Sequence, residues 1–240
     1  MNCEGSLVAE QVTFQSSGGG SIPTSPLQLR VARLEGSDAA DVTKILFREV
    51  HYSKRTPGSM QYVFGLFDGQ GIAGAVSFGP PPSPQVRRSV VGGANIAVLE
   101  LNRLVIVTAE RNAASKLVGR ALKMLPPAIV VSYADGGQGH IGYVYQATNF
   151  WYAGMATAHD TEYIVDGVRI HPRTLASRGI TSPAAWAKAR GYARVPALPK
   201  HRYVIAVGGA TYDAVLWLRS KDYPKGESKR YAAPNQMRAK

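Results

Sequence analysis

Residues 128–154 constrain the fold more than any other stretch of this chain. Residues 128–133 form an apolar, β-branched run with the length of an interior strand, and Gly136, Gly137 and Gly139 end it. Apolar and aromatic residues then recur at a spacing of three to four from residue 140 to 153, which predicts an amphipathic helix. Asp135 therefore lies beyond the carboxyl end of a strand, where open α/β sheets bind their ligands.

The remaining chain alternates between strand and helix patterns. Two hairpins are predicted around the turn dipeptides at Asp68 and Asp166, each followed by glycine. Residues 79–93 are predicted to be a loop because of their prolines, with Arg87 and Arg88 as candidate contacts for a polyanion. Further strands are predicted at residues 27–34, 96–107 and 201–209, and further helices at residues 38–53, 108–125 and 181–195, the last with Ser182 as its cap and Pro183 at its first position. Residues 211–220 fit either a helix or a strand.

These patterns predict an α/β (α+β) fold with a mixed central sheet flanked by helices. One domain is expected over residues 27–218, because 240 residues with 45% hydrophobic content can bury a single substantial core. Residues 1–26, rich in Gly, Ser and Pro near their end, are predicted to be a flexible leader. Residues 219–240 carry a net charge of +5 and are predicted to be a basic tail that acts as an electrostatic arm.

The charge balance points to a polyanionic partner. The chain has 28 Lys and Arg residues against 16 Asp and Glu residues, a net charge of +12, which favours nucleic acid. An ordinary basic protein, or one that binds an anionic cofactor such as coenzyme A, would fit the same charge. No apolar run approaches the roughly 18 residues that a membrane span requires, and the single cysteine, Cys3, excludes an intramolecular disulfide. A cytoplasmic protein without a membrane partner is expected.

Polar residues interrupt the long apolar strand predicted at residues 96–107. Glu100, Asn102 and Arg103 must be paired or face a cavity, because burying a lone charge costs several kcal/mol. The following helix begins with small residues, and its exposed amide groups would accept a phosphate.

The order of these elements resembles that of the GNAT acyltransferases. In that family the first turn of the helix after the long strand holds a pyrophosphate through an Arg/Gln-x-x-Gly-x-Gly/Ala loop. The equivalent here is residues 111–116, which begin with Arg111. Ala114 and Lys116 occupy positions where the family has small, glycine-type residues. The resemblance implies an acyl donor such as acetyl-coenzyme A at this helix start.

Residues 51–154 resemble, more specifically, the Mom family of phage DNA modification proteins. The resemblance rests on HYS at 51–53, ELNRL at 100–104, the helix start at Ser115, and SYAD at 132–135 followed by GHIGYVYQATNFWYAG at 139–154. It implies an enzyme that converts adenine in DNA to an N6-carbamoylmethyl derivative and shields phage DNA from restriction in the host cytoplasm. Double-stranded DNA would then be the partner, and a homodimer is left open.

The resemblance implies roles for six residues. Asp135, Tyr145 and His51 would be catalytic, whereas Arg103, Arg111 and Ser115 would bind the donor. On their patterns alone, Asp135 equally fits a turn before Gly136, and Tyr145 on an apolar helix face fits the core. His51 fits the C-terminal end of a helix, and Arg103 fits an ion pair with Glu100 or another carboxylate.

Cofactors are expected on the same basis. His51, Asp135 and Tyr145 would form a metal site, with iron as the metal that the resemblance implies, although no HxH or HxxxH pattern is present. The product's atoms fit a modified acetyl transfer, or a glycine-derived donor such as an aminoacyl group. An aminoacyl-tRNA donor would add RNA as a partner.

Three functions fit the sequence. The first is the DNA-modifying enzyme, in which the target adenine leaves the base stack and is covered by Tyr143, Phe150, Trp151 or Tyr152. The second is a conventional acetyl-coenzyme A-dependent N-acetyltransferase acting on a small amine or a protein. The third is a DNA-binding module without catalytic activity on the same scaffold.

Overall fold

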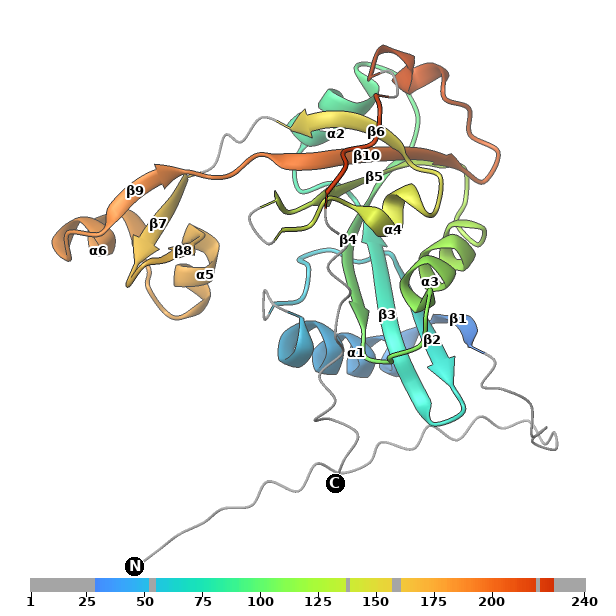
Figure 1. Cartoon of the computed structure of the whole chain (residues 1–240), viewed down its shortest axis with the longest axis horizontal. Helices are drawn as coiled ribbons and strands as arrows, with labels where there is room; N and C mark the ends of the chain where they lie inside the picture. Colours follow the sequence, from blue (N-terminus) through green and yellow to red (C-terminus); the bar gives the residue numbers. More distant parts are fainter. Residues whose placement is uncertain (1–28, 52–54, 137–138, 157–160, 219–220, 227–240) are drawn as a thin grey trace, which may run out of the picture.

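The main body is a single mixed sheet of seven strands. The computed structural model describes residues 29–51, 55–136, 139–156, 161–218 and 221–226, and the strand order of the sheet is β1-β2-β3-β4-β5-β10-β6 (Figure 1). The predicted α/β class and both predicted hairpins are confirmed. The strands are β1 (Arg30–Leu34), β2 (Tyr62–Asp68), β3 (Gly71–Gly79), β4 (Val98–Ile106), β5 (Ala128–Ala134), β6 (Trp151–Ala156) and β10 (Lys200–Val207).

Helices cover both faces of the sheet. On one face, here called the α3 face, α3 (Ala113–Leu122) places Leu117 in a cluster with Val130 of β5. The opposite face, here called the α1 face, is covered by α1, a π-helical continuation of α1, α2 and a 3-10 helix. Phe47 packs there in a cluster with Val105 of β4. The bounds of these elements are α1 (Gly36–Thr43), the π-helix (Lys44–Val50), α2 (Pro84–Val91) and the 3-10 helix (Asp213–Leu218).

The sheet opens between β4 and β5. These strands run parallel and pair only from Val98 to Glu100. Beyond Glu100, β4 stays paired with β3 as far as Ile106, whereas β5 stays paired with β10 as far as Ala134. Two strands that leave one another while each keeps its other partner create an opening in the sheet. Ser132 Oγ donates a hydrogen bond to the carbonyl oxygen of Leu101 (3.2 Å) where the strands part.

A β-bulge in β4 decides which side chains face this opening. Leu101 lies opposite Phe78 and Arg103 lies opposite Ser77, so Asn102 is an extra residue. Its side chain accepts a hydrogen bond from Ser77 Oγ (2.6 Å). Alternation along a strand would place Glu100 and Arg103 on opposite faces. The extra residue reverses the alternation, and both side chains lie on the α1 face.

A small lobe is inserted between β6 and β10. It has a three-stranded sheet in the order β8-β7-β9, two short helices and its own cluster around Tyr163, Leu175 and Ala187. Figure 1 shows the lobe projecting from one side of the main sheet. Its elements are β7 (Thr161–Val165), β8 (Val168–Ile170), α5 (Pro172–Ser177), α6 (Pro183–Ala189) and β9 (Ala193–Pro196).

The helix predicted over residues 140–153 is wrong for most of its length. The structure has a four-residue helix, α4 (Tyr143–Gln146), followed by the strand β6. Asn149 adopts a left-handed conformation (φ 63°) and ends the helical turn, and β6 then pairs antiparallel with β10. Pairing with β10 overrode the helical spacing, because the continuous apolar run at residues 150–153 fits a buried strand as well as a helix.

Residues 84–91 also differ from the prediction, because they form α2 and no loop. Ser83 caps this helix by accepting a hydrogen bond from the amide of Val86 (3.3 Å), and Pro84 occupies its first turn, where a missing amide costs nothing. Arg87 donates to the carbonyl oxygens of Ala94 and Ile96, so its guanidinium holds the following turn. Of the two predicted polyanion contacts, only Arg88 is exposed.

Residues 221–226, part of the predicted tail, pack on the main body. The backbone amide of Lys221 donates to the carbonyl oxygen of Tyr152 (2.8 Å), and the hydroxyl of Tyr223 donates to the carbonyl oxygen of Phe150 (2.7 Å). A pocket of about 550 Å³ lies between this segment and the residues Tyr143 and Gln146 of α4. The predicted leader and Cys3 lie outside the described residues. Within the described ranges, no helix has the length and apolarity that crossing a bilayer demands.

Candidate active site

Glu100 is the last residue of β4 that pairs with β5, at the point where the two strands part. Burial raises the pKa of its carboxyl group from 4.5 to about 7, against the opposing influence of Lys200, Arg103 and Arg173. Its Oε2 atom is buried and has no hydrogen-bond partner. A carboxyl group that titrates near neutral pH can both accept and release a proton, which is the property of a general acid or base.

His51 reaches the same cluster from the end of the π-helix. Its backbone amide donates to the carbonyl oxygen of Leu46 (2.9 Å) and ends that helix. Burial, and then the charges of Arg103 and His140, lower the pKa of the imidazole to about 4. His51 is therefore neutral at physiological pH. The structure brings together two predicted site residues, His51 and Arg103, with Glu100.

The guanidinium groups of Arg103 and Arg173 lie close enough for their charges to lower the pKa of Glu100. Arg103 donates through Nε to the carbonyl oxygen of Arg55 (3.3 Å) and through Nη1 to that of Asn102 (2.7 Å). Arg202 of β10 donates to the carbonyl oxygen of Ser89 (3.1 Å). Within the described residues, Glu100 forms no ion pair, so the alternative of a Glu100–Arg103 ion pair is wrong.

Tyr133 lies opposite Arg202 in the pairing of β5 with β10. Burial raises the pKa of its phenol to about 12, and Arg202 and Glu100 also act on it, in opposite directions. Tyr133 therefore stays protonated and can donate a hydrogen bond on the α1 face of the opening.

Three buried polar atoms have no hydrogen-bond partner: Arg55 Nε, Glu100 Oε2 and Arg202 Nε. They are all the atoms of this kind among the described side chains. Arg103 donates to the backbone of Arg55, and the charges of Arg202 and Glu100 both act on Tyr133. Buried polar groups are almost always satisfied, because each unpaired one costs about 1 to 3 kcal/mol. One acceptor and two donors left unpaired around an opening in the sheet indicate a site for a polar ligand.

Asp135 lies where the sequence predicts, directly after β5, and its side chain is half-buried. Its carbonyl oxygen accepts a hydrogen bond from the amide of His140 (3.1 Å). Because His140 acts on the pKa of His51, the loop that follows Asp135 borders the Glu100 cluster. A catalytic role for Asp135 stays a prediction that its position allows.

Tyr145 lies on the α3 face, in the core. Its exposed fraction is 8%, and its ring packs against Phe150 and Tyr203 with centroids 5.4 Å and 5.2 Å away. Tyr203 in turn packs against Tyr152, so these four rings form a row, here called the aromatic row. Phe150 and Tyr152 are buried in this row and do not cover a flipped base. A catalytic role for the Tyr145 hydroxyl stays a prediction.

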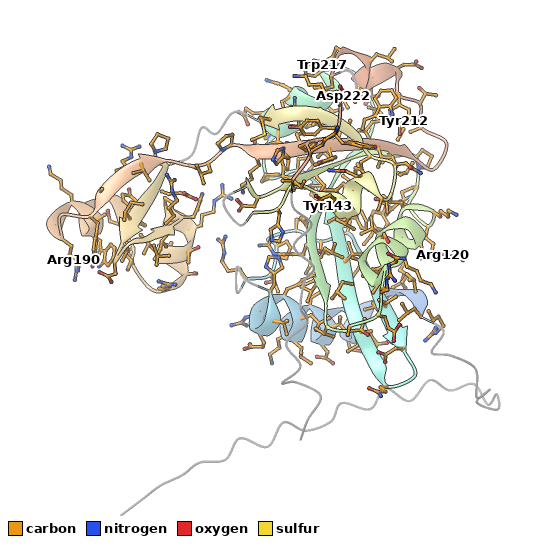
Figure 2. All side chains as sticks on the ribbon, in the orientation of Figure 1. Arg120, Tyr143, Arg190, Tyr212, Trp217 and Asp222 are labelled. Atoms are coloured by element: carbon orange, nitrogen blue, oxygen red, sulfur yellow. The ribbon has the colours of Figure 1, made fainter. Side chains whose placement is uncertain are left out.

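Two further candidates for a flipped base differ in exposure. Trp151 stacks on Tyr212 with ring centroids 3.8 Å apart, which occupies one face of its indole. The side chain of Tyr143 on α4 is 39% exposed. Its position is labelled in Figure 2. Tyr143 is therefore the one of the four predicted rings that is exposed.

The predicted donor residues Arg111 and Ser115 lie at the start of α3. Arg111 is exposed, and Ser115 Oγ donates to the carbonyl oxygen of Asn112 (3.1 Å). The first turn of α3 contains no acidic residue, so its amide groups and the Arg111 guanidinium suit a phosphate. These residues fit the phosphate groups of an acyl-coenzyme A, whereas Arg103 belongs to the Glu100 cluster.

The predicted iron site does not fit the structure. The described residues contain no group of three or more His, Cys, Asp and Glu side chains that could hold a metal ion. Tyr145, the third predicted ligand, lies in the aromatic row. No step of the reaction is therefore assigned to iron.

Several site residues were missed by sequence reasoning: Arg55, Tyr133, Lys200 and Arg202. Their signal was weak, because single polar residues at strand ends are common. Glu100 was noted as a buried polar residue but was not assigned a role. Its position inside a long apolar strand is the signal that could have identified it.

The stability of the protein should reveal the buried carboxyl group of Glu100. Between pH 4.5 and about 7 the folded protein retains a proton that the unfolded chain releases. The free energy of unfolding therefore loses about 3 kcal/mol as the pH rises through this window. A glutamine side chain has no proton to release, so the free energy of unfolding of Glu100→Gln should lack this decrease. In urea denaturation, the free energy of unfolding of the variant minus that of the wild type should therefore increase by about 3 kcal/mol between about pH 4.5 and pH 8. A difference that is equal at both pH values would contradict this.

Comparison with known proteins identifies the family of this chain. The model of the Mom protein family matches residues 28–225, which include β4, the Glu100 cluster and the lobe. The chain belongs to the Mom protein family. Over 141 residues it is 32% identical to the methylcarbamoylase mom of Escherichia phage Mu, a match that covers 56% of this chain and 58% of that protein. The match thus spans less than two thirds of the relative's length.

The chain is also similar to solved acetyltransferase structures. These include a GNAT acetyltransferase of Bacillus cereus (12% identity, TM-score 0.41) and a Bacillus subtilis acetyltransferase in complex with CoA (10%, 0.40). A further one is the spermidine N-acetyltransferase of Vibrio cholerae (12%, 0.41). Each match covers 75% of this chain, and 98%, 99% and 94% of the other chain respectively. The mixed α/β sheet flanked by helices agrees with the predicted GNAT-like fold.

Proposed function

We propose that this protein is a transferase that modifies the N6 amino group of adenine in DNA, giving a carbamoylmethyl derivative that protects the DNA from restriction. Membership of the Mom protein family and the name of the phage Mu relative support a group transfer of this kind. The observation that carries the proposal is the buried Oε2 atom of Glu100, which has no hydrogen-bond partner, together with the unpaired buried Nε atoms of Arg55 and Arg202. The carboxylate can accept a hydrogen bond from an exocyclic amino group, and guanidinium groups can donate to ring nitrogens or phosphate oxygens.

The exocyclic nitrogen must lose a proton when it gains a new bond. Glu100 is the residue proposed to accept that proton, because its pKa of about 7 makes its ionised form abundant at neutral pH without making it a weak base. His51, neutral because of its low pKa, can accept or donate a hydrogen bond beside it. Asp135 is proposed to act from the loop that borders this cluster.

The phosphate groups of the donor are proposed to bind Arg111 and the first amide groups of α3. A simple acyl transfer from coenzyme A would bond N6 to a carbonyl carbon and give an N-acyl adenine. The proposed donor therefore carries a modified acetyl group or a glycine-derived aminoacyl group, which would leave N6 bonded to the methylene carbon of the carbamoylmethyl product. Arg103, whose guanidinium is held by two carbonyl oxygens in the Glu100 cluster, would orient the polar end of the transferred group.

Adenine N6 is enclosed in duplex DNA, so the base must leave the stack to reach Glu100 at a cost of a few kcal/mol. Tyr143 is the exposed aromatic side chain on the segment that was predicted to cover such a base. If the ring of Tyr143 covers the flipped base, the base must reach the α3 side of the opening. The rate of adenine modification by Tyr143→Ala tests this.

Mass spectrometry of nucleosides tests the proposal. DNA from cells that express the protein should contain an adenine derivative heavier by the mass of a carbamoylmethyl group, and DNA from cells without it should not. An N-acetyl mass, or thiol release from acetyl-coenzyme A without DNA, would favour a conventional N-acetyltransferase. Unmodified adenine despite folded protein, together with DNA binding that survives Glu100→Gln, would favour a binding module without catalytic activity.

A further inference from the structure

The lobe between β6 and β10 is unusually basic. Residues 161–200 contain seven Lys and Arg residues against two acidic residues, a net charge of +5 out of +12 for the whole chain. One sixth of the residues therefore carries more than a third of the net charge. Arg190 marks the end of the lobe that lies farthest from the main sheet in Figure 2.

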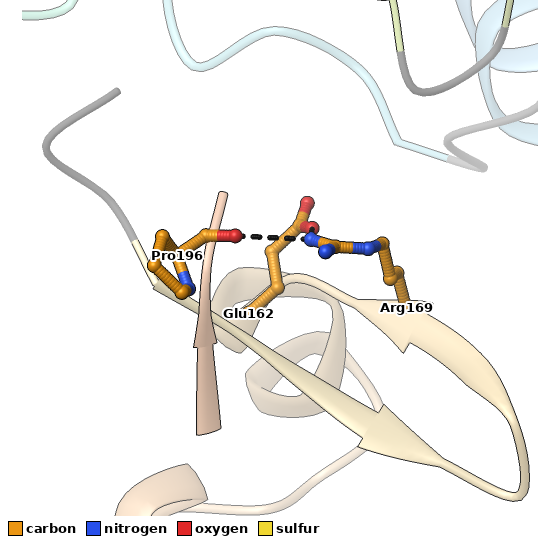
Figure 3. Close-up of polar contacts among 3 residues, drawn as sticks. All are labelled: Glu162, Arg169 and Pro196. Carbon is orange, nitrogen blue, oxygen red and sulfur yellow. Dashed lines mark hydrogen bonds and ion pairs between the residues drawn. The ribbon is translucent and has the colours of Figure 1, made fainter. Parts of the chain in front are cut away.

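Both acidic side chains of the lobe are already engaged. Glu162 Oε2 accepts from Arg169 Nη1 (3.0 Å), and the same nitrogen donates to the carbonyl oxygen of Pro196 (2.9 Å), as Figure 3 shows. Asp166 accepts a weak hydrogen bond from the hydroxyl of Tyr192 (3.4 Å). The salt bridges among the described residues leave the other cations of the lobe without an acidic partner. All of them are exposed: Arg173, Arg178, Lys188, Arg190, Arg194 and Lys200.

This basic surface continues into the Glu100 cluster. Arg173 of α5 and Lys200 at the start of β10 are close enough for their charges to act on the Glu100 carboxyl group. Lys200 belongs to the strand that leads from the lobe back into the main sheet. A polyanion bound along the lobe would therefore pass the opening between β4 and β5.

We propose that the lobe binds the phosphate backbone of duplex DNA and directs one base of that duplex into the Glu100 site. This inference rests on the proposed function for its substrate. Six exposed cations lie on two helices and their C-terminal ends, on β9 and at the start of β10. This distribution suits an extended polyanion, because a small anion would need only one or two of them. Neutralising phosphates with Lys and Arg releases counterions, so such binding weakens steeply with salt.

A charge-neutralised variant tests this surface. Arg178, Lys188 and Arg194 have no side-chain partner among the described residues, so replacing all three with Gln removes charge without removing a contact of the fold. The matched control replaces Lys44, Arg120 and Lys123, three exposed cations on the π-helix and α3, with Gln. Fluorescence anisotropy with a labelled duplex of about 20 base pairs would give the affinity at several salt concentrations.

The lobe variant should lose a salt slope of about 2 to 3 and at least about tenfold in affinity at low salt, because each phosphate contact contributes about 0.9 to the slope. The control variant should retain the slope of the wild type. Equal losses in the two variants, or none in the lobe variant, would overturn the proposal. Tighter lobe-dependent binding to a single strand of the same sequence than to the duplex would also overturn it.

The lobe and the proposed chemistry can fail separately. If wild-type protein modifies adenine while the lobe variant binds duplex as the wild type does, the surface is wrong and the function stands. If no adenine is modified but duplex binding depends on the lobe, the surface stands and the function is wrong.

Discussion

Glu100→Gln is expected to lower the amount of modified adenine by about 100- to 10,000-fold, which is the typical contribution of a general base. Glutamine keeps the size of the side chain but cannot accept the proton that N6 releases. The site should stay intact, because the amide removes a buried charge. The yield of modified nucleoside per molecule of folded protein, measured by mass spectrometry at a fixed time, checks this expectation.

The pH dependence gives the same prediction a second readout. Ionised Glu100 is the active form, so the wild-type rate should rise as the pH increases through about 7 and then level off. The residual rate of Glu100→Gln should lack that rise. Glu35→Gln is the matched control, because Glu35 pairs with Arg33 on the surface with 73% of its side chain exposed. A variant at Glu100 with wild-type yield and wild-type pH profile would remove Glu100 from the chemistry.

Tyr145→Ala is expected to reduce the free energy of unfolding by about 3 to 5 kcal/mol, the usual cost of removing a buried aromatic ring. The ring is 8% exposed and touches two members of the aromatic row, so the cavity would form in the core under α3. Tyr145→Phe keeps the ring and should cost only about 1 kcal/mol for the lost hydroxyl contact. Urea denaturation of both variants measures these differences.

Tyr143→Ala serves as the control on the same helix. Its ring is 39% exposed and its hydroxyl donates to the carbonyl oxygen of Gly226, so its loss should cost about 1 kcal/mol or less. A small loss in Tyr145→Ala would contradict the core position. A fall in DNA modification for Tyr145→Phe that greatly exceeds its loss of stability would place the Tyr145 hydroxyl in the reaction.

Local chemistry determined much of the fold. Both hairpins form at the Asp-Gly dipeptides of the sequence. In the second hairpin the dipeptide adopts the positive φ that it tolerates (Asp166, 50°), whereas in the first the positive φ lies at Gly71. The strand β5 follows from an apolar, β-branched run that has the length of a buried strand. The helix α2 was missed although Ser83 and Pro84 form a helix start, because the preceding prolines dominated the pattern.

Pairing between distant strands decided the structure of residues 128–154, the segment that most constrains the fold. Residues 151–156 carry a spacing that fits a helix, yet β10, about fifty residues later in the chain, offers them a strand edge to pair with. The same pairing places Tyr145 against Tyr203 of β10 and so assigns its ring to the core. No local pattern contains this partner, since propensity reports only the nearest neighbours of a residue.

The sequence by itself determined that Glu100 and Arg103 are polar residues within an apolar strand, and that His51 ends a helix. Only the tertiary structure decided that these three side chains meet. Asn102 is accommodated as a bulge because Ser77 of the neighbouring strand binds its side chain, and the bulge turns Arg103 to the face that Glu100 occupies. The opening beside them exists because β4 and β5 each hold a second partner that leads them apart, a property of the assembled sheet.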